Sequence, residues 1–261
     1  MAGSLDSALA KVARAEEHLG RLQEEIGRWR EKCGDRMARD NNDERTEFRW
    51  YTQWDVDPDG VRWALLLGDG IHNLRSALDH AVYACSGPRP PARCEFPIFL
   101  DRTKFFRPVS DESGGLYKIR GIKDPVIRAL IEGAQPWQNP RRPKYHWFWI
   151  VHELDIQDKH RLITPVVMTP RDLRGGIGGE LIGGGRAIVH ISGPGRVPLE
   201  NHALLMTVRT PKPARWMEVD ASLDLGIGVE VADSEMGISS VLRETCKATR
   251  GLIEQIRDAV S

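Results

Sequence analysis

Hydrophobic side chains change their spacing near residue 162 of this chain. Before that point they recur every three or four residues, as on the buried face of a helix. Beyond it they come in short runs broken by glycine and proline, as in strands, until a last helical repeat closes the chain. Helices and strands that are segregated along a sequence are typical of α+β folds. The sequence therefore predicts a helical bundle with an antiparallel β-sheet inserted before the C-terminal helix.

The limits of these regions follow from the same change of spacing. Residues 1–161 are expected to be mainly helical, with an irregular loop at 87–118. Residues 162–235 are expected to form the antiparallel β region, and residues 236–261 a C-terminal helix that packs back on the bundle. At 261 residues, the chain suits one large domain or two closely joined ones.

Individual elements are predicted from periodicity and from turn residues such as Gly and Pro. Long helices are expected near 5–34, 61–86, 143–160 and 239–260, and a short helix is expected to open at Asp124-Pro125 and to run through Ile131. Strands are expected at 48–56, 162–168, 186–191, 203–209, 216–223 and 228–231. Residues 36–45 are interpreted as a charged turn. The glycine-rich stretch at 175–185 is interpreted as a flexible hairpin, because it lacks the Gly-x-Gly-x-x-Gly spacing of a phosphate-binding loop.

Composition and charge argue against several classes of protein. Lys and Arg together number 37, as do Asp and Glu, so no global field attracts nucleic acid or an anionic membrane. The four cysteines show no Cys-x-x-Cys spacing, which disfavours a zinc ribbon or a thioredoxin-like motif. We find no signal-peptide pattern and no apolar run of about 18 residues that could span a bilayer. We therefore expect a cytoplasmic protein with reduced thiols and no membrane partner.

The second expected helix contains a stretch of unusual composition at residues 68–80. This stretch is apolar enough to be core, yet it also carries a stripe of polar groups. Buried polar groups cost free energy unless they are partnered, so the stripe is either an internal hydrogen-bond network or a chemical site. The residues of interest in it are Asp69, His72, Asn73, Arg75, Asp79 and His80.

A second polar segment, at residues 152–161, lies in the third long helix and is the natural partner of the first. Each helix carries a polar stripe beside a core stripe, so we predict that the two polar stripes face each other. Within the first stripe, Arg75 and Asp79 have the i,i+4 spacing of an ion pair. The second segment is expected to contribute His152, Asp155, Asp158, Lys159, His160 and Arg161.

Three interpretations of the stripes stay open. In one, they neutralise each other as a structural network, or bind a small anionic ligand, and no catalysis occurs. In another they hold a metal ion, because Asp69 with His72, and His152 with Asp155, have i,i+3 spacings suited to ligands on facing helices. The pattern lacks the glutamates of di-iron bundles, and we predict no tightly bound metal and no cofactor. In the third, the stripes are catalytic.

The catalytic interpretation starts from the segment Arg75-Ser-Ala-Leu-Asp-His80. This Arg-x4-His spacing resembles the signature of the HEPN superfamily of helical ribonucleases and defence toxins, which cleave RNA without metal. The resemblance implies that His80 handles the proton of the ribose 2′-hydroxyl or of the leaving oxygen, and that Arg75 stabilises the extra charge on phosphorus. His72 and Asp79 would support them. RNA is the implied partner, and a homodimer could bring Arg75 and His80 together, since they point about 140° apart on a straight helix.

A wider pattern, Gly-Asp-x-x-His-Asn-x-Arg-Ser-Ala-Leu-Asp-His with Phe-Pro-Ile-Phe and Asp-Lys-His-Arg downstream, resembles a family of uncharacterised bacterial and phage proteins. The resemblance covers roughly residues 62–168. It implies no activity, so it supports these segments as units of structure and leaves the reaction open.

Overall fold

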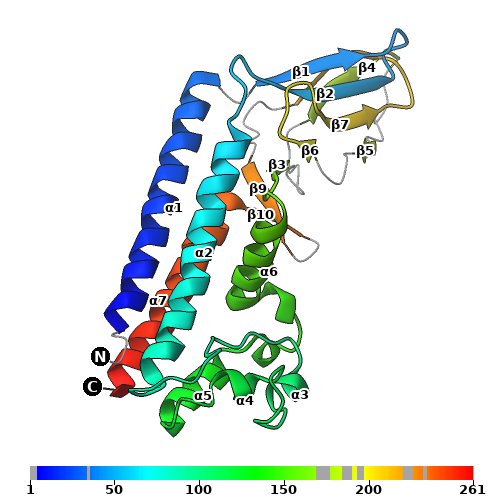
Figure 1. Cartoon of the computed structure of the whole chain (residues 1–261). Helices are drawn as coiled ribbons and strands as arrows, with labels where there is room; N and C mark the ends of the chain where they lie inside the picture. Colours follow the sequence, from blue (N-terminus) through cyan, green and yellow to red (C-terminus); the bar gives the residue numbers. More distant parts are fainter. Residues whose placement is uncertain are drawn as a thin grey trace.

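Three long helices lie side by side in the computed structural model, with one group of strands beyond one end of them and another group beside them (Figure 1). The helices are α1 (Leu5–Cys33), α2 (Gly60–Cys85) and α7 (Ile238–Val260). A fourth helix, α6 (Trp147–His160), packs on α2 and α7. The structure describes residues 5–33, 36–168, 177–183, 190–192, 197–219, 226–231 and 234–260.

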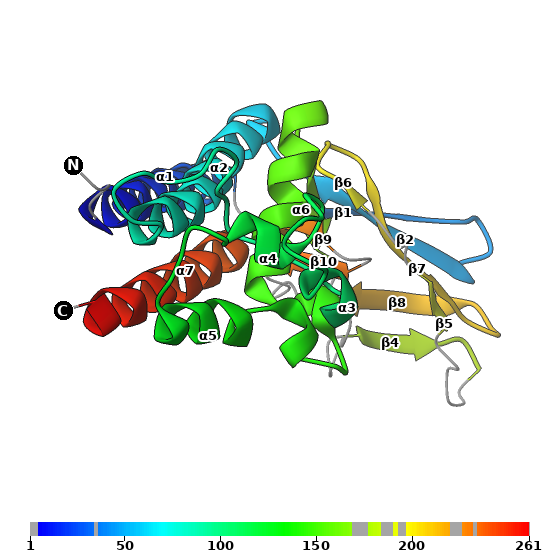
Figure 2. The same cartoon turned by 60° about the horizontal axis from the view of Figure 1, so that its bottom comes forward.

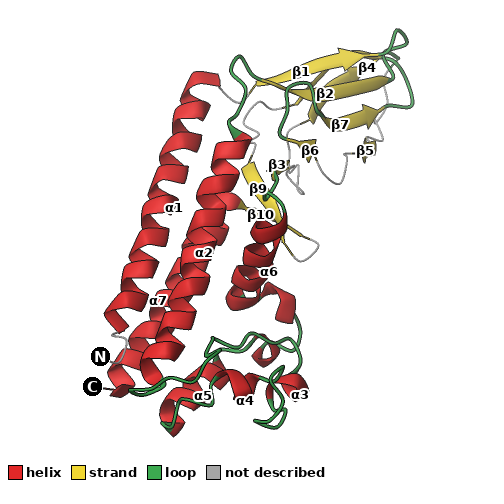
Figure 3. Cartoon of the chain, viewed as in Figure 1, coloured by secondary structure: helices red, strands yellow, loops and turns green. Residues whose placement is uncertain are grey.

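One group of strands lies beyond the helices, whereas another group packs against them (Figure 3). This arrangement confirms the predicted α+β class, with strands between the early helices and the C-terminal helix. None of the helices in the described ranges combines the length and the apolar character that crossing a bilayer requires.

The limits of α2 follow from local chemistry at its two ends. Asp59 caps the start, because its side chain accepts a hydrogen bond from the backbone N–H of Arg62 at 3.0 Å. At the other end, the hydroxyl of Ser86 donates to the carbonyl of Val82 at 2.8 Å. Gly87 follows with φ of 81°, a left-handed conformation that ends a helix at little cost only for glycine.

Within the described residues, the strands form three antiparallel sheets. Their orders are β1-β2-β7-β5 and β10-β9-β3-β6 for the four-stranded sheets, and β4-β8 for the two-stranded one. The strand bounds are β1 Arg36–Asn41, β2 Glu47–Gln53, β3 Pro165–Met168, β4 Ile177–Leu181, β5 His190–Ser192, β6 Val197–Pro198, β7 Leu204–Arg209, β8 Ala214–Val219, β9 Gly226–Val231 and β10 Ser234–Gly237.

The first sheet corrects one expectation about the N-terminal region. The charged turn predicted at 36–45 is wrong for its first residues, because β1 pairs there with β2. β1 lies at the edge of its sheet, where exposed positions tolerate charged side chains such as Arg39 and Asp40. The sheet also joins distant parts of the chain, since β2 pairs with β7 and Trp50 stands opposite Met206.

The loop expected at 87–118 is more ordered than the sequence pattern indicated, since it contains the short helices α3 (Arg102–Phe105) and α4 (Gly115–Lys118). The next helix, α5 (Pro125–Gly133), confirms the short helix predicted to open at Asp124-Pro125. In the turned view, α5 lies along α7 (Figure 2). The helix expected from residue 143 begins instead at Trp147, because residues 143–145 form a 3-10 turn and His146 caps the next turn.

Three further strands, β4, β6 and β10, escaped prediction because they are short or rich in glycine and polar residues. Parts of the expected strands at 186–191 and 216–223, and of the expected hairpin at 175–185, lie outside the described residues.

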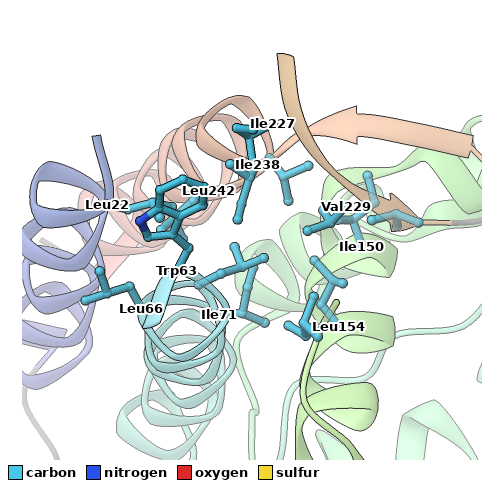
Figure 4. Packing of buried hydrophobic residues seen from close by; sticks show 14 of the residues in the cluster. Leu22, Trp63, Leu66, Ile71, Ile150, Leu154, Ile227, Val229, Ile238 and Leu242 are labelled. Carbon is cyan, nitrogen blue, oxygen red and sulfur yellow. The ribbon is translucent and has the colours of Figure 1, made fainter. Parts of the chain in front are cut away.

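The main hydrophobic core lies where α1, α2, α6, α7 and β9 converge (Figure 4). Trp63 and Ile71 from α2 meet Leu154 from α6 and Leu242 from α7 there. A second cluster, beneath it, packs Phe96 and Phe148 between α2, α5 and the loop that follows α2. These two clusters fix the position of α6 against α2, which matters for the polar residues between them.

Candidate functional site

Helices α2 and α6 pack with opposite chain directions, so residues early in α2 meet residues late in α6. Gly68 lies against the carboxylate of Asp158, and His72, one turn further along α2, meets Asp155, about one turn earlier on α6. The prediction that the two polar stripes face each other is confirmed by these contacts.

The central contact joins an exposed imidazole to a buried carboxylate. His72 Nδ1 lies 3.0 Å from Asp155 Oδ1, and Lys159 Nζ lies 2.6 Å from Asp155 Oδ2. The side chain of Asp155 is 4% exposed, whereas that of His72 is 59% exposed. Water screens the attraction between charged groups, and a buried group is screened less than an exposed one. The buried Asp155 carboxylate therefore attracts both partners more strongly than an exposed carboxylate would.

This contact also determines which imidazole nitrogen carries the proton. A carboxylate can only accept hydrogen bonds, so neutral His72 is assigned its proton on Nδ1. The lone pair then resides on Nε2, the nitrogen on the far side of the ring from Asp155. An imidazole oriented in this way can accept a proton from a substrate that approaches its exposed edge.

Arg75 and Asp79 form the ion pair predicted from their spacing, and both bind the loop that follows α2. Arg75 Nη2 donates to Asp79 Oδ1 and to the carbonyl oxygen of Phe96, each at 2.9 Å. Asp79 Oδ1 also accepts from the backbone N–H of Phe96 at 2.8 Å. We call Arg75, Asp79 and the Phe96 backbone the Phe96 clamp. It holds the Phe96 ring in the core, 5.6 Å from the ring of Phe148.

Burial dominates the electrostatics around this clamp. Desolvation raises the pKa of Asp79, and the Arg75 cation opposes that effect only in part. Desolvation also lowers the pKa of His152, and the cations Arg75 and Lys118 lower it further. Lys118 Nζ binds Glu95 at 2.6 Å, and Glu95 lies 3.9 Å from Arg75. His152 is therefore suited to remain neutral among charged neighbours.

The other side of the α2 stripe faces α1. Lys11 Nζ donates to Asn73 Oδ1 at 3.5 Å, and Asn73 Nδ2 donates to the carbonyl of Asp69 at 2.8 Å. His18 of α1 is 6% exposed, and its Nδ1 finds no hydrogen-bond partner in the described part of the chain. Desolvation lowers the pKa of His18, an effect that the nearby Asp69 carboxylate opposes.

Arg75 and His80 have separate partners in the structure. Arg75 belongs to the Phe96 clamp, whereas His80 Nδ1 lies 3.2 Å from the hydroxyl of Ser7 on α1. His80 and Asp79 line a surface hollow of about 420 Å³. The described residues of a single chain thus do not bring the arginine and histidine of the Arg-x4-His motif to a common partner.

The last two candidates, His160 and Arg161, lie exposed at the end of α6. The backbone N–H of Arg161 closes the helix on the carbonyl of Gln157 at 2.8 Å. Its side chain lines a hollow of about 700 Å³ that also includes Trp149 and Gln157. His160 lies about 140° around α6 from Asp155, and Arg161 follows the last residue of the helix, so neither extends the His72 contact.

Sequence reasoning missed three charged residues of this region, Lys11, Glu95 and Lys118. Each is a single charge on an amphipathic helix or in a loop, and such charges are usually solvated. No local pattern distinguishes them, because their partners lie far away in the sequence.

The metal interpretation receives no support from the arrangement of ligands. Among the described residues, no group of three His, Cys, Asp or Glu side chains is placed to hold a metal ion. His72 and Asp155, one from each expected ligand pair, bind each other instead.

Comparison of the chain with protein-family models, with curated proteins and with solved structures found no match. The chemistry of the site is therefore argued from its own geometry.

Proposed function

We propose that this protein is a metal-independent ribonuclease in which His72 is the proton acceptor. The observation that carries the proposal is the contact between the exposed His72 imidazole and the buried Asp155 carboxylate. Histidine is the side chain best suited to proton transfer near neutral pH, and a carboxylate that orients it increases its effect. RNA contains its own nucleophile, the ribose 2′-hydroxyl, so one oriented base and positive charge are sufficient to start the reaction.

In the proposed reaction, His72 Nε2 removes the 2′-hydroxyl proton while the 2′-oxygen attacks the adjacent phosphorus. The bond from phosphorus to the 5′-oxygen breaks, which leaves a 2′,3′-cyclic phosphate and a 5′-oxygen that must receive a proton to become the 5′-hydroxyl end. Asp155 stabilises the imidazolium that forms. Lys159, bound to Asp155 and 54% exposed, supplies positive charge beside the phosphate. Lys11 adds a second cation from α1, beyond Asn73.

This assignment differs from the one that the HEPN resemblance implies. There, Arg75 and His80 would be the catalytic pair, which requires them to converge. Arg75 Nη2 already donates two hydrogen bonds within the Phe96 clamp, one to Asp79 and one to the Phe96 carbonyl. This engagement of Arg75 favours His72 over the arginine–histidine pair as the catalytic group. A homodimer belongs only to the arginine–histidine arrangement, because the contact of His72 with Asp155 is complete in one chain. Cleavage of cellular RNA would fit the cytoplasmic location expected from the sequence.

The Phe96 clamp favours a second candidate function, a non-catalytic network. It satisfies both polar groups of the Phe96 backbone and joins α2 to the loop at 87–118. In this alternative, the polar stripes of α2 and α6 determine how the two helices pack, or they bind a small anion near Lys159. His72 then has no substrate.

Cleavage of a 5′-labelled RNA oligonucleotide in EDTA tests the proposal. The wild-type protein is expected to cleave, and His72→Gln to cleave at least roughly 100-fold more slowly, since an oriented acid–base group contributes about 10²- to 10⁴-fold. His202→Asn is the matched control, because His202 is exposed and its φ of 62° suits asparagine. Its rate should equal that of the wild type.

Two results would overturn the assignment. One is the absence of wild-type cleavage at micromolar protein, which would favour the non-catalytic network. The other is full activity in His72→Gln together with loss of activity in His80→Gln, which would favour the arginine–histidine pair.

A further inference from the structure

The carboxylate of Asp158 lies unusually close to the backbone of α2. An ideal Cβ placed on Gly68 would lie no more than 2.7 Å from Oδ1, Cγ and Oδ2 of Asp158, closer than real Cβ atoms come. Only glycine at position 68 therefore admits Asp158 in this position. Since glycine in the middle of a helix costs about 0.5–1 kcal/mol relative to alanine, this close approach is a specific feature of the α2–α6 contact.

Charged groups surround Asp158 from both helices. Asp69 and His72 face it from α2, and Asp155 belongs to its own helix, where it also binds Lys159. Desolvation, followed by the Asp69 and Asp155 carboxylates, raises the pKa of Asp158, while His72 opposes the shift. A carboxyl group of this kind keeps its proton to higher pH than a free aspartate does.

We propose that Asp158 is the second proton-transfer group of the His72 site and that Gly68 positions it there. The inference rests on the proposed function. While His72 takes the proton of the 2′-hydroxyl, the protonated Asp158 gives its proton to the 5′-oxygen as the phosphorus–oxygen bond breaks. Each step then moves one proton, and the enzyme ends with His72 protonated and Asp158 ionised. Transfer of that proton from His72 back to Asp158 restores both groups.

A leaving group that needs no proton tests this role. Asp158→Asn should slow cleavage of an RNA dinucleotide at least roughly 100-fold. The same variant should retain near-wild-type turnover of uridine 3′-(4-nitrophenyl phosphate), because nitrophenolate leaves as a stable anion. His72→Gln should be slow on both substrates. Equal loss on both substrates for Asp158→Asn, or no loss on either, would overturn the role of Asp158 as the acid.

Gly68→Ala tests the positioning without removing a charge. The added methyl group must displace the Asp158 carboxylate, so the variant should lose RNA cleavage and keep the nitrophenyl reaction, as Asp158→Asn does. Gly20→Ala on α1 is the matched control, because a Cβ there meets nothing within 4 Å. Both substitutions introduce alanine into a helix, so both variants should fold. Wild-type dinucleotide cleavage by Gly68→Ala would overturn the positioning.

An NMR spectrum of the His72 ring separates this inference from the proposed function, because it needs no RNA. Asp158→Asn and Gly68→Ala should each change the chemical shifts of the His72 ring nitrogens, because both substitutions alter the carboxyl group that faces the imidazole. Gly20→Ala should leave these shifts unchanged. If the wild type fails to cleave RNA but the shifts move, the two groups share a site and the proposed ribonuclease is wrong. Unmoved shifts would overturn the inference whatever the activity.

Discussion

Two aspartates on facing helices have different tasks because their partners differ. Asp155 binds two side chains, His72 and Lys159, and leaves the imidazole exposed. Asp79 binds the side chain of Arg75 and the backbone of Phe96, so its hydrogen bonds stabilise the fold.

The i,i+4 spacing of Arg75 and Asp79 made their ion pair predictable from the sequence. Their shared contact with Phe96 was not predictable, since it depends on where the loop returns to α2.

Asp79→Ala should therefore act on stability. It leaves the Phe96 N–H without its acceptor and removes one of the two acceptors of Arg75 Nη2, which is expected to cost about 2–4 kcal/mol in the free energy of unfolding. Glu17→Ala breaks the exposed ion pair with Arg14 on α1 and should cost less than about 1 kcal/mol. Urea unfolding of the two variants measures both changes. Equal midpoints for the two would show that the Phe96 clamp does not stabilise the loop.

At the scale of elements, the helices were predictable and the sheet pairing was not. An apolar stripe that repeats over many turns predicts each long helix, as in α2 and α7. β1 and β10 carry no comparable pattern, and β6 has only two residues. The pairing of β2 with β7 joins residues about 150 positions apart, a choice made by tertiary packing. For the same reason, the sequence indicated that α2 and α6 meet, but not which residues form the contact.

The docking of α1 on the bundle should depend on pH through His18. Burial lowers the pKa of His18 in the folded state, so the unfolded chain binds its proton more readily. Stability is then intact above the unfolded value of about 6.5 and falls as the pH drops below it. His18→Leu should weaken this dependence, although the lowered pKa values of His146 and His152 leave part of it. Melting temperatures from pH 7.5 to 5 measure the slope; parallel curves for the two proteins would contradict the account.

At the scale of the whole molecule, the His72 contact lies beside the main hydrophobic core. Ile71, Leu74 and Leu154 of that core, all fully buried, lie next to the polar residues in sequence, and Phe148 packs the first turn of α6 into the second cluster. Side chains on helices that are fixed in this way keep their geometry without a ligand. The bundle therefore acts as a rigid support for a polar contact that opens to solvent at His72.

The account's central claim is that His72 and Asp155 act as one unit in RNA cleavage. The direct measurement is the single-turnover rate, in EDTA, of the wild type, His72→Gln, Asp155→Asn and the double variant, with thermal melting to confirm that each is folded. Asp155→Asn should slow cleavage roughly 100-fold, and the double variant should be no slower than His72→Gln, because groups that act together are not additive. A double variant whose loss equals the product of the two single losses, or Asp155→Asn at the wild-type rate, would contradict the claim.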